Sequence, residues 1–282
     1  MEKIGLIVDS TTLTREDLKK YKFLKEVQLK IQIDQKTYVE NQLTSEEMER
    51  YIDEGKKFLT SQPSPSEFLK VYKEFYEEGY THVIAVLLPH KISGTYQSAL
   101  VAKTLVDFDL EIEIHTPESA SFGIALGVNQ LAKTIEKAKS FDEVQKKYYS
   151  IFQKPLVAFT LGDLGHLFRG GRLNRVQAFI GKILRIKPII EIIDGKLDLV
   201  RKERTNLACM EYFISKINNY VNEYKNVYLD IVSLNMEEWG QKIIDYVKEN
   251  LKKVDIHVTD YVSPVFYSHL GNKGFGIAIV AE

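Results

Sequence analysis

The chain has 282 residues, enough for one large domain or two domains of ordinary size. Its 38 Lys and Arg residues against 39 Asp and Glu give a net charge of -1, so the overall charge does not favour nucleic acid or an anionic membrane as a partner. The single cysteine, Cys209, excludes an internal disulfide and a cysteine-built zinc cluster, and with no signal peptide and no apolar run of about 18 residues we expect a cytoplasmic protein.

The first half of the chain alternates apolar strands with helices that have clear start signals. Such a signal is a Ser or Thr followed three positions later by an acidic residue, because the two side chains cap free backbone N–H groups. The strands are predicted at residues 4–8, 27–33, 83–88 and 112–115, and helices begin at Thr14, Thr44 and Ser64. This order is typical of a doubly wound α/β domain with a mostly parallel sheet.

The second half has a different pattern. Residues 188–200 form two apolar segments around Asp194 and Gly195, which predicts a β-hairpin with a tight turn. It is followed by predicted helices at 207–224 and 237–251 and predicted strands at 227–233, 255–262 and 275–280. We therefore expect two domains, an N-terminal α/β domain at 1–154 and a C-terminal mixed α/β domain at 155–282.

Hydroxyl groups are concentrated where the predicted strands end. In open parallel sheets, ligands bind at the carboxyl ends of the strands, and hydroxyls near helix N-termini suit a carboxylate or a phosphate. Each segment taken alone is better explained by helix capping, the ordinary role of Ser and Thr, and the presence of four such segments weakens that explanation without removing it. The segments are Asp9-Ser10-Thr11, Thr60-Ser61, Ser93-Gly94-Thr95 and residues 117–121.

Ser93 lacks the surroundings of a hydrolase nucleophile. A nucleophile elbow needs G-x-S-x-G, and no glycine stands two residues before Ser93. The sequence also has no P-loop, no G-x-G-x-x-G after a strand and no metal-binding histidine spacing, so we expect no nucleotide, cofactor or metal. Two glycine-rich segments each have two interpretations. The segment LFRGGRLNR, which contains Arg172, is either a backbone that approaches a ligand closely or a solvated turn. The segment SHLGNKGFG either directs His269 towards an anion or contains it as a structural residue.

Together these segments resemble the DegV family, the bacterial fatty-acid-binding proteins that serve as the acyl-carrying subunit of fatty acid kinase. The resemblance extends over the whole chain and rests on the order and spacing of its motifs. These are Asp9-Ser10-Thr11, the segment from Thr60 to Pro65, the segment from Ser93 to Ala99, Gly170-Gly171-Arg172, Lys187-Pro188, Arg204-Thr205, and His269 with Gly271. The resemblance implies two α/β domains with a long-chain fatty acid bound between them as the only ligand.

The resemblance also implies roles for particular residues. Arg172 and Arg204 would support phosphoryl transfer or docking of an ATP-dependent fatty acid kinase, the implied protein partner. Transient contact with a membrane surface would fit a protein that carries lipid. The groups that would bind the fatty-acid carboxylate are Thr60, Ser61, Ser93, the backbone of Gly94, and His269, the last directly or through water.

Two other functions stay open at this level. A serine acyl hydrolase or transferase would use Ser93 with His269 and would turn over acyl esters without a partner. A lipid-sensing regulatory protein would change a protein contact when lipid binds. We favour a non-catalytic carrier that presents the carboxylate to a kinase, because the sequence has acid-binding groups without a nucleophile elbow.

Overall fold

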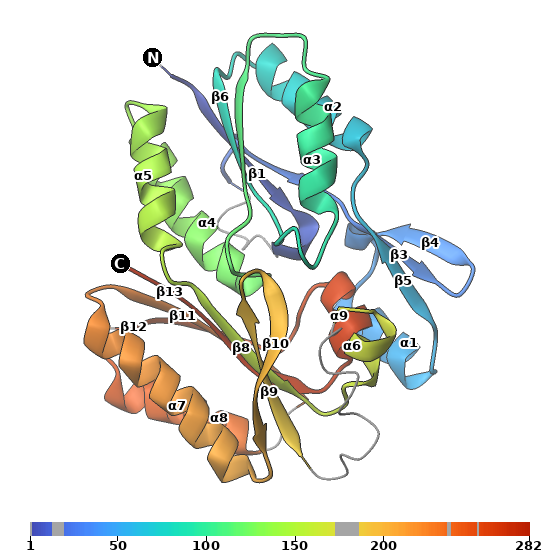
Figure 1. Cartoon of the computed structure of the whole chain (residues 1–282), viewed down its shortest axis with the longest axis vertical. Helices are drawn as coiled ribbons and strands as arrows, with labels where there is room; N and C mark the ends of the chain where they lie inside the picture. The colour runs from blue at the N-terminus through green and yellow to red at the C-terminus, as the bar shows by residue number, and fades with distance from the viewer. Residues whose placement is uncertain (1, 13–19, 173–185, 236–237, 253) are drawn as a thin grey trace.

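Three β-sheets organise the part of the chain that the computed structural model describes, residues 2–12, 20–172, 186–235, 238–252 and 254–282 (Figure 1). One sheet has four parallel strands, one has six strands of mixed direction, and one has three antiparallel strands. The parallel sheet lies in the first half of the chain and the mixed sheet in the second. The predicted α/β class and the contrast between the two halves are therefore confirmed.

The parallel sheet is covered on both faces. Its strands, in the order β2-β1-β6-β7, are Leu24–Val27, Ile4–Asp9, His82–Val86 and Glu111–His115. Ile7 and Val83 pack with helices α2 (Pro65–Glu77) and α3 (Thr95–Thr104). Leu6 belongs to the core cluster on the opposite face. Because neither face of the two central strands meets water, β1 and β6 are nearly continuous apolar runs in the sequence, whereas the edge strands β2 and β7 include charged residues.

Helix α4 (Phe122–Ile135) lies between the parallel sheet and the mixed sheet, beside α5 (Phe141–Ile151) (Figure 1). Eleven consecutive residues, from Phe122 to Ala132, are buried. A side chain at Gly127 would meet the Phe152 ring at 2.0 Å, so glycine is needed for this close packing. No helix in the described ranges is both long enough and apolar enough to span a lipid bilayer.

The mixed sheet has the order β10-β9-β8-β13-β11-β12. The predicted hairpin is confirmed: β9 and β10 pair antiparallel around Asp194 and Gly195, whose φ angles are 50° and 68°. Helices α7 and α8 pack on the face that points away from α4 (Figure 1). The bounds are β8 Leu156–Leu161, β9 Lys187–Ile193, β10 Lys196–Glu203, α7 Asn206–Glu223, β11 Val227–Leu234, α8 Glu238–Asn250, β12 Val254–Thr259 and β13 Gly274–Ala281.

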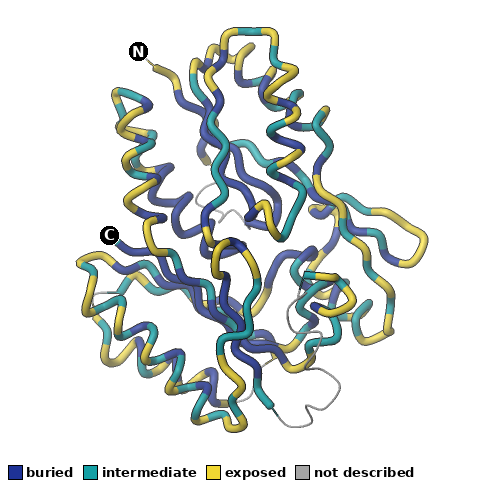
Figure 2. The backbone as a smooth tube through the Cα atoms, viewed as in Figure 1, coloured by how far each residue is buried: buried dark blue, intermediate teal, exposed yellow. Residues whose placement is uncertain are grey.

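The change from parallel to mixed sheet falls between α5 and β8. One core cluster nevertheless contains Leu6 and Val8 from β1 together with Ala278 and Val280 from β13. In Figure 2 the buried stretches of the tube gather in the central strands of both sheets and in α4. Residues 1–154 and 155–282 therefore share a core, and the division into two domains at this boundary stays a prediction.

The single strand predicted at residues 27–33 is wrong. The segment contributes to two strands, because Val27 ends β2 in the parallel sheet whereas β3 (Lys30–Ile33) pairs with β4 (Lys36–Val39) and β5 (Phe58–Ser61). The alternation of apolar and polar residues continues through Gln28 and Leu29, although the chain passes there from one sheet to another. The predicted helix start at Thr14 lies outside the described residues.

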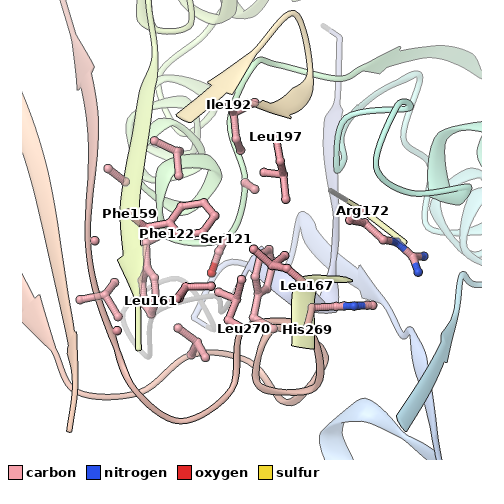
Figure 3. A pocket seen from close by; sticks show the side chains of 18 of the residues that line it. Ser121, Phe122, Phe159, Leu161, Leu167, Arg172, Ile192, Leu197, His269 and Leu270 are labelled. Atoms are coloured by element: carbon pink, nitrogen blue, oxygen red, sulfur yellow. The ribbon is translucent and has the colours of Figure 1, made fainter. Parts of the chain in front are cut away.

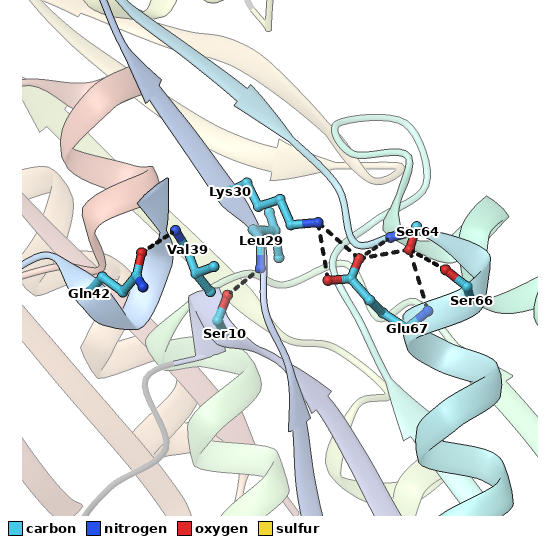
Figure 4. Close-up of polar contacts among 8 residues, drawn as sticks. All are labelled: Ser10, Leu29, Lys30, Val39, Gln42, Ser64, Ser66 and Glu67. Carbon is cyan, nitrogen blue, oxygen red and sulfur yellow. Dashed lines mark hydrogen bonds and ion pairs between the residues drawn. The ribbon is translucent and has the colours of Figure 1, made fainter. Parts of the chain in front are cut away.

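Two predicted capping boxes are confirmed. Thr44 accepts from the Glu47 N–H ahead of α1 (Ser45–Asp53), and Ser64 accepts from the Glu67 N–H ahead of α2. Glu67 also forms an ion pair with Lys30 of β3, with 3.1 Å between Nζ and Oε1 (Figure 4). The start of α2 is thereby attached to the three-stranded sheet.

Candidate functional site

A largely apolar cavity lies between the two halves of the chain (Figure 3). Its wall combines the ends of parallel strands, the start of α4, one face of the mixed sheet, and helices α6 (Gly165–Arg169) and α9 (Pro264–Leu270). A wall of this kind suits a hydrocarbon chain, because it offers dispersion contacts and few hydrogen-bond partners. The large apolar side chains labelled in Figure 3 are Phe122, Phe159, Leu161, Leu167, Ile192, Leu197 and Leu270.

The polar groups of the wall are few, and four of them lie in two pairs, Thr60 with His269 and Arg172 beside Ser93. Thr60 on β5 and His269 on α9 are hydrogen-bonded, with 2.9 Å between Oγ1 and Nε2. The side chain of Arg172 donates from Nε to the Ile92 carbonyl at 3.3 Å, immediately before Ser93. Figure 3 shows His269 and Arg172 on the same side of the cavity. We call Thr60, Ser93, Arg172 and His269 the polar end of the wall; Ser121 and Thr160 are the other hydroxyl-bearing residues that line the cavity.

His269 is held as a neutral imidazole at this polar end. Burial, with the positive charges of Arg172 and His166, lowers its pKa from 6.5 to about 4. Its Nε2 contacts Thr60, whereas its Nδ1, among the described residues, has no hydrogen-bond partner. The ring packs against Gly170, where a Cβ would come within 2.4 Å of Nδ1. The imidazole is thus fixed in place and has one ring nitrogen without a bond.

The stability of the ligand-free protein should depend on pH through His269. Because the folded pKa of about 4 lies below the ordinary 6.5, the unfolded chain takes up a proton first, and acidification from pH 7 towards pH 4 destabilises the fold. The shift corresponds to at most about 3 kcal/mol. We expect His269→Gln to remove this contribution, so the difference in unfolding free energy between wild type and variant should shrink at low pH.

Asp9 has the opposite dependence, since burial raises its pKa from 3.8 to about 6 and favours the folded state on acidification. That contribution is common to wild type and His269→Gln and cancels in the difference. Urea unfolding at several pH values measures the comparison. An unchanged difference between pH 7.5 and pH 4.5 would show that His269 titrates normally in the folded protein.

The structure separates the hydroxyls predicted to bind a carboxylate. Thr60 and Ser93 line the cavity. Ser61 is exposed, because neighbouring residues of β5 point to opposite sides. Gly94 is outside the wall and is the N-cap of α3, packed against Gln62, where a Cβ would come within 2.9 Å. Of the five groups predicted to bind the carboxylate, Thr60, Ser93 and His269 thus line the cavity, and Ser61 and Gly94 do not.

Ser93 combines a local and a cavity-facing position. Its hydroxyl lies 2.8 Å from the Thr95 hydroxyl and accepts from the Thr95 N–H at 3.3 Å. The residue itself precedes the N-cap of α3, which is Gly94. The capping interpretation is therefore only partly supported, since the Ser93 side chain closes a local turn while it lines the cavity.

The two arginines predicted to act together lie in different surroundings. Arg172 is partly buried, lines the cavity and donates to the Gly170 carbonyl at 2.7 Å. Burial lowers the pKa of its guanidinium but leaves it charged. Arg204 is exposed, follows β10 and lies outside the cavity wall. Of the two, only Arg172 is placed to meet a ligand in the cavity.

The Asp9-Ser10-Thr11 motif is used inside the protein. Asp9 accepts from the Leu88 N–H at 2.8 Å and from the Thr11 N–H at 3.1 Å, and is fully buried. Ser10 accepts from the Leu29 N–H at 2.9 Å and donates to Glu40. None of the three motif residues lines the cavity. At this position the hydroxyl that follows a strand therefore connects neighbouring segments of the protein and does not line the cavity.

The structure does not assemble a serine hydrolase from the described residues. Ser93 contacts Thr95, and His269 contacts Thr60, so nucleophile and base are not hydrogen-bonded to each other. No described carboxylate is bonded to Nδ1 of His269 to orient it, as a triad requires. The same ranges contain no group of three His, Cys, Asp or Glu residues arranged to hold a metal ion.

Sequence reasoning missed the apolar wall. Ile192, Leu197 and Leu161 belong to three strands of the mixed sheet, and Leu270 lies on α9. In the sequence these residues have the pattern of ordinary core positions. No local signal distinguishes a side chain that fills a core from one that lines a cavity.

Comparison with known proteins agrees with this architecture. The sequence profile described as "Uncharacterised protein, DegV family COG1307" matches residues 3–282. The DegV domain-containing protein TTE1491 of Caldanaerobacter subterraneus is 31% identical over 253 residues, covering 89% of this chain and 90% of that protein. The DegV domain-containing protein SACOL1460 of Staphylococcus aureus is 27% identical over 285 residues, covering 100% of both chains.

Solved structures share the fold over the full length. A stearic acid-binding protein from Eubacterium ventriosum is 25% identical with a TM-score of 0.85, covering 100% of this chain and 98% of that chain. The fatty acid binding DegV family protein SAG1342 from Streptococcus agalactiae is 24% identical with a TM-score of 0.90, covering 100% of both. Because the family profile matches nearly the entire sequence, the chain belongs to the DegV family.

Proposed function

We propose that this protein binds one long-chain fatty acid, with the acyl chain in the apolar cavity and the carboxylate at the polar end. The observation that supports this most directly is the group of polar side chains Thr60, Ser93, Arg172 and His269 on a wall whose other residues are mostly apolar. The guanidinium and the hydroxyls are donors that an ionised carboxylate accepts from. The related proteins that bind stearic and other fatty acids support the same ligand class.

The two ends of the ligand contribute differently to binding. Burial of each methylene group contributes about 0.8 kcal/mol relative to water. An acyl chain of about fifteen methylene groups therefore gains on the order of 12 kcal/mol of binding free energy before the costs of association. A fatty acid dissolved in a membrane has already left water. The selectivity over the bilayer therefore depends on the shape of the cavity and on the donors that compensate for burying the carboxylate.

Native mass spectrometry of the purified protein, followed by extraction of retained lipid, tests the proposal. We expect one fatty acid per chain. A folded, delipidated sample should then rebind acids of C14 to C20 in calorimetric titration. If none of these acids binds to the delipidated protein, the proposed ligand is wrong.

We further propose that the protein is the non-catalytic, cytoplasmic carrier of a fatty acid kinase system. The bound carboxylate would attack the terminal phosphorus of ATP held by the partner kinase, giving acyl phosphate and ADP. The lack of a serine hydrolase arrangement among the described residues agrees with a carrier. Exposed Arg204 is then available to contact the kinase or its nucleotide.

Arg204→Ala should separate lipid binding from phosphorylation. Because Arg204 is exposed and outside the cavity wall, we expect unchanged fatty-acid affinity and a roughly tenfold or greater loss of acyl phosphate formation with the cognate kinase. Arg201→Ala is the matched control, an exposed arginine three positions earlier. Normal phosphorylation of Arg204→Ala would leave this arginine as an ordinary surface residue.

A further inference from the structure

A buried carboxylate outside the cavity wall is attached to the helix that bears His269. Glu40, in the short helix η2 (Glu40–Gln42), is only 2% exposed. Its Oε1 accepts from the Val265 N–H at 2.9 Å, and its Oε2 accepts from the Ser10 hydroxyl. Val265 lies in the first turn of α9, four residues before His269. Glu40 thus binds the beginning of α9 across a sequence separation of 225 residues.

The same carboxylate is connected to another part of the cavity. The Ser10 hydroxyl accepts from the Leu29 N–H at 2.9 Å, as Figure 4 shows, and Leu29 lines the cavity next to the start of β3. Strand β5, which bears Thr60, pairs with β3. Glu40 and Ser10 therefore link the three-stranded sheet, which bears Thr60, to helix α9, which bears His269.

The start of α9 is held by packing as well as by this carboxylate, since Pro264 and Val265 are buried. The helix has seven residues, and the hydroxyl of its N-cap, Ser263, accepts from the Phe266 N–H at a long 3.5 Å. A buried carboxylate costs free energy unless its oxygens are hydrogen-bonded. Here it accepts from a backbone N–H and from a hydroxyl, an arrangement that specifies where the helix begins.

We infer that Glu40 is a positioning residue for the fatty-acid head group, which fixes the start of α9 so that His269 stays against Thr60. The identity of the ligand in this inference rests on the proposed function, whereas the effect of Glu40 on the position of His269 does not. Without Glu40, the Val265 N–H in the first turn of α9 loses its acceptor. The helix that places Nε2 of His269 2.9 Å from Oγ1 of Thr60 then loses one of the bonds that fix its position.

The first test needs no ligand and follows the imidazole of His269 by NMR titration. In Glu40→Ala we expect the pKa of His269 to rise from about 4 by about one unit or more, because a displaced α9 exposes the ring to water. Arg172 and His166, the charged and titratable groups that face His269, are unchanged in the variant. Glu40→Gln keeps an acceptor for Val265 and should stay near wild type.

Glu49→Gln is the matched control, since Glu49 accepts from the Tyr267 hydroxyl of the same helix at 3.2 Å. It should leave the titration of His269 unchanged. If Glu40→Ala does not fold, Ser10→Ala removes the hydroxyl that holds Oε2 and should shift the same pKa in the same direction.

The second test compares palmitic acid with hexadecan-1-ol, which has the same chain without the charge. We expect Glu40→Ala to lose about tenfold in affinity for the acid and little for the alcohol, with recovery in Glu40→Gln. Equal losses for both ligands, or a His269 titration identical to wild type in folded Glu40→Ala, would overturn the inference. If wild type binds neither ligand, the proposed function fails, and the NMR titration still decides whether Glu40 positions His269.

Discussion

Replacing Leu197 with aspartate should abolish fatty-acid binding. Leu197 lies on β10 and its side chain lines the apolar wall (Figure 3). A carboxylate there would face an alkyl chain without a hydrogen-bond partner, and protonation of the aspartate would itself cost free energy. We expect a loss of about a hundredfold or more in affinity for stearic acid, measured by calorimetric titration of delipidated protein.

Two control variants make the result specific. Leu59→Asp introduces the same charge on β5 at a side chain that is 66% exposed and outside the wall, and should bind normally. Leu197→Met keeps the apolar surface and nearly the same volume. Circular dichroism must show that Leu197→Asp is folded. Normal affinity in that folded variant would place the acyl chain somewhere else.

Arg172→Met should weaken the binding of the carboxylate strongly while the acyl chain still finds its wall. Arg172 is the only Lys or Arg among the residues that line the described cavity, and it is partly buried beside His269. Loss of a charge-assisted hydrogen bond to a desolvated carboxylate costs about 1.5–3 kcal/mol, or roughly tenfold to a hundredfold in affinity. Methionine keeps much of the side-chain volume.

The charge of Arg172 also predicts a second effect. Because that charge lowers the pKa of His269, Arg172→Met should raise it. Arg169→Met is the matched control, an exposed arginine on α6 outside the wall. Palmitic acid and hexadecan-1-ol again separate head-group from chain effects, with the loss expected for the acid alone. Undiminished acid binding in Arg172→Met would confine this arginine to a role after binding, as the family resemblance implies.

The sequence by itself determined the elements whose signals are local. Capping boxes at Thr44 and Ser64 set the starts of α1 and α2, and Asp194-Gly195 set the hairpin of β9 and β10. A cap or a tight turn is decided by the backbone conformation of a few neighbouring residues, so its signal is complete within the sequence. The order of the motifs was sufficient to identify the DegV family.

Only the tertiary structure decided which of the marked residues share a site. Thr60 and Ser61 are adjacent in the sequence but lie on opposite sides of β5, a strand that was not predicted. Arg172 and Arg204 were assigned one role, yet only Arg172 reaches the cavity. The pairing of strands that are distant in the sequence fixes these differences, and no window of neighbouring residues contains that information.

The same reason explains the Asp9-Ser10-Thr11 motif and the cavity wall. A hydroxyl that follows a strand looks the same in the sequence whether it binds a ligand or a group of the protein itself. Ser10, for example, donates to the carboxylate of Glu40. Leu161 and Leu197 likewise have the pattern of core residues although they line a cavity. Hydrophobicity specifies burial, whereas the space left between buried side chains depends on how distant elements pack against one another.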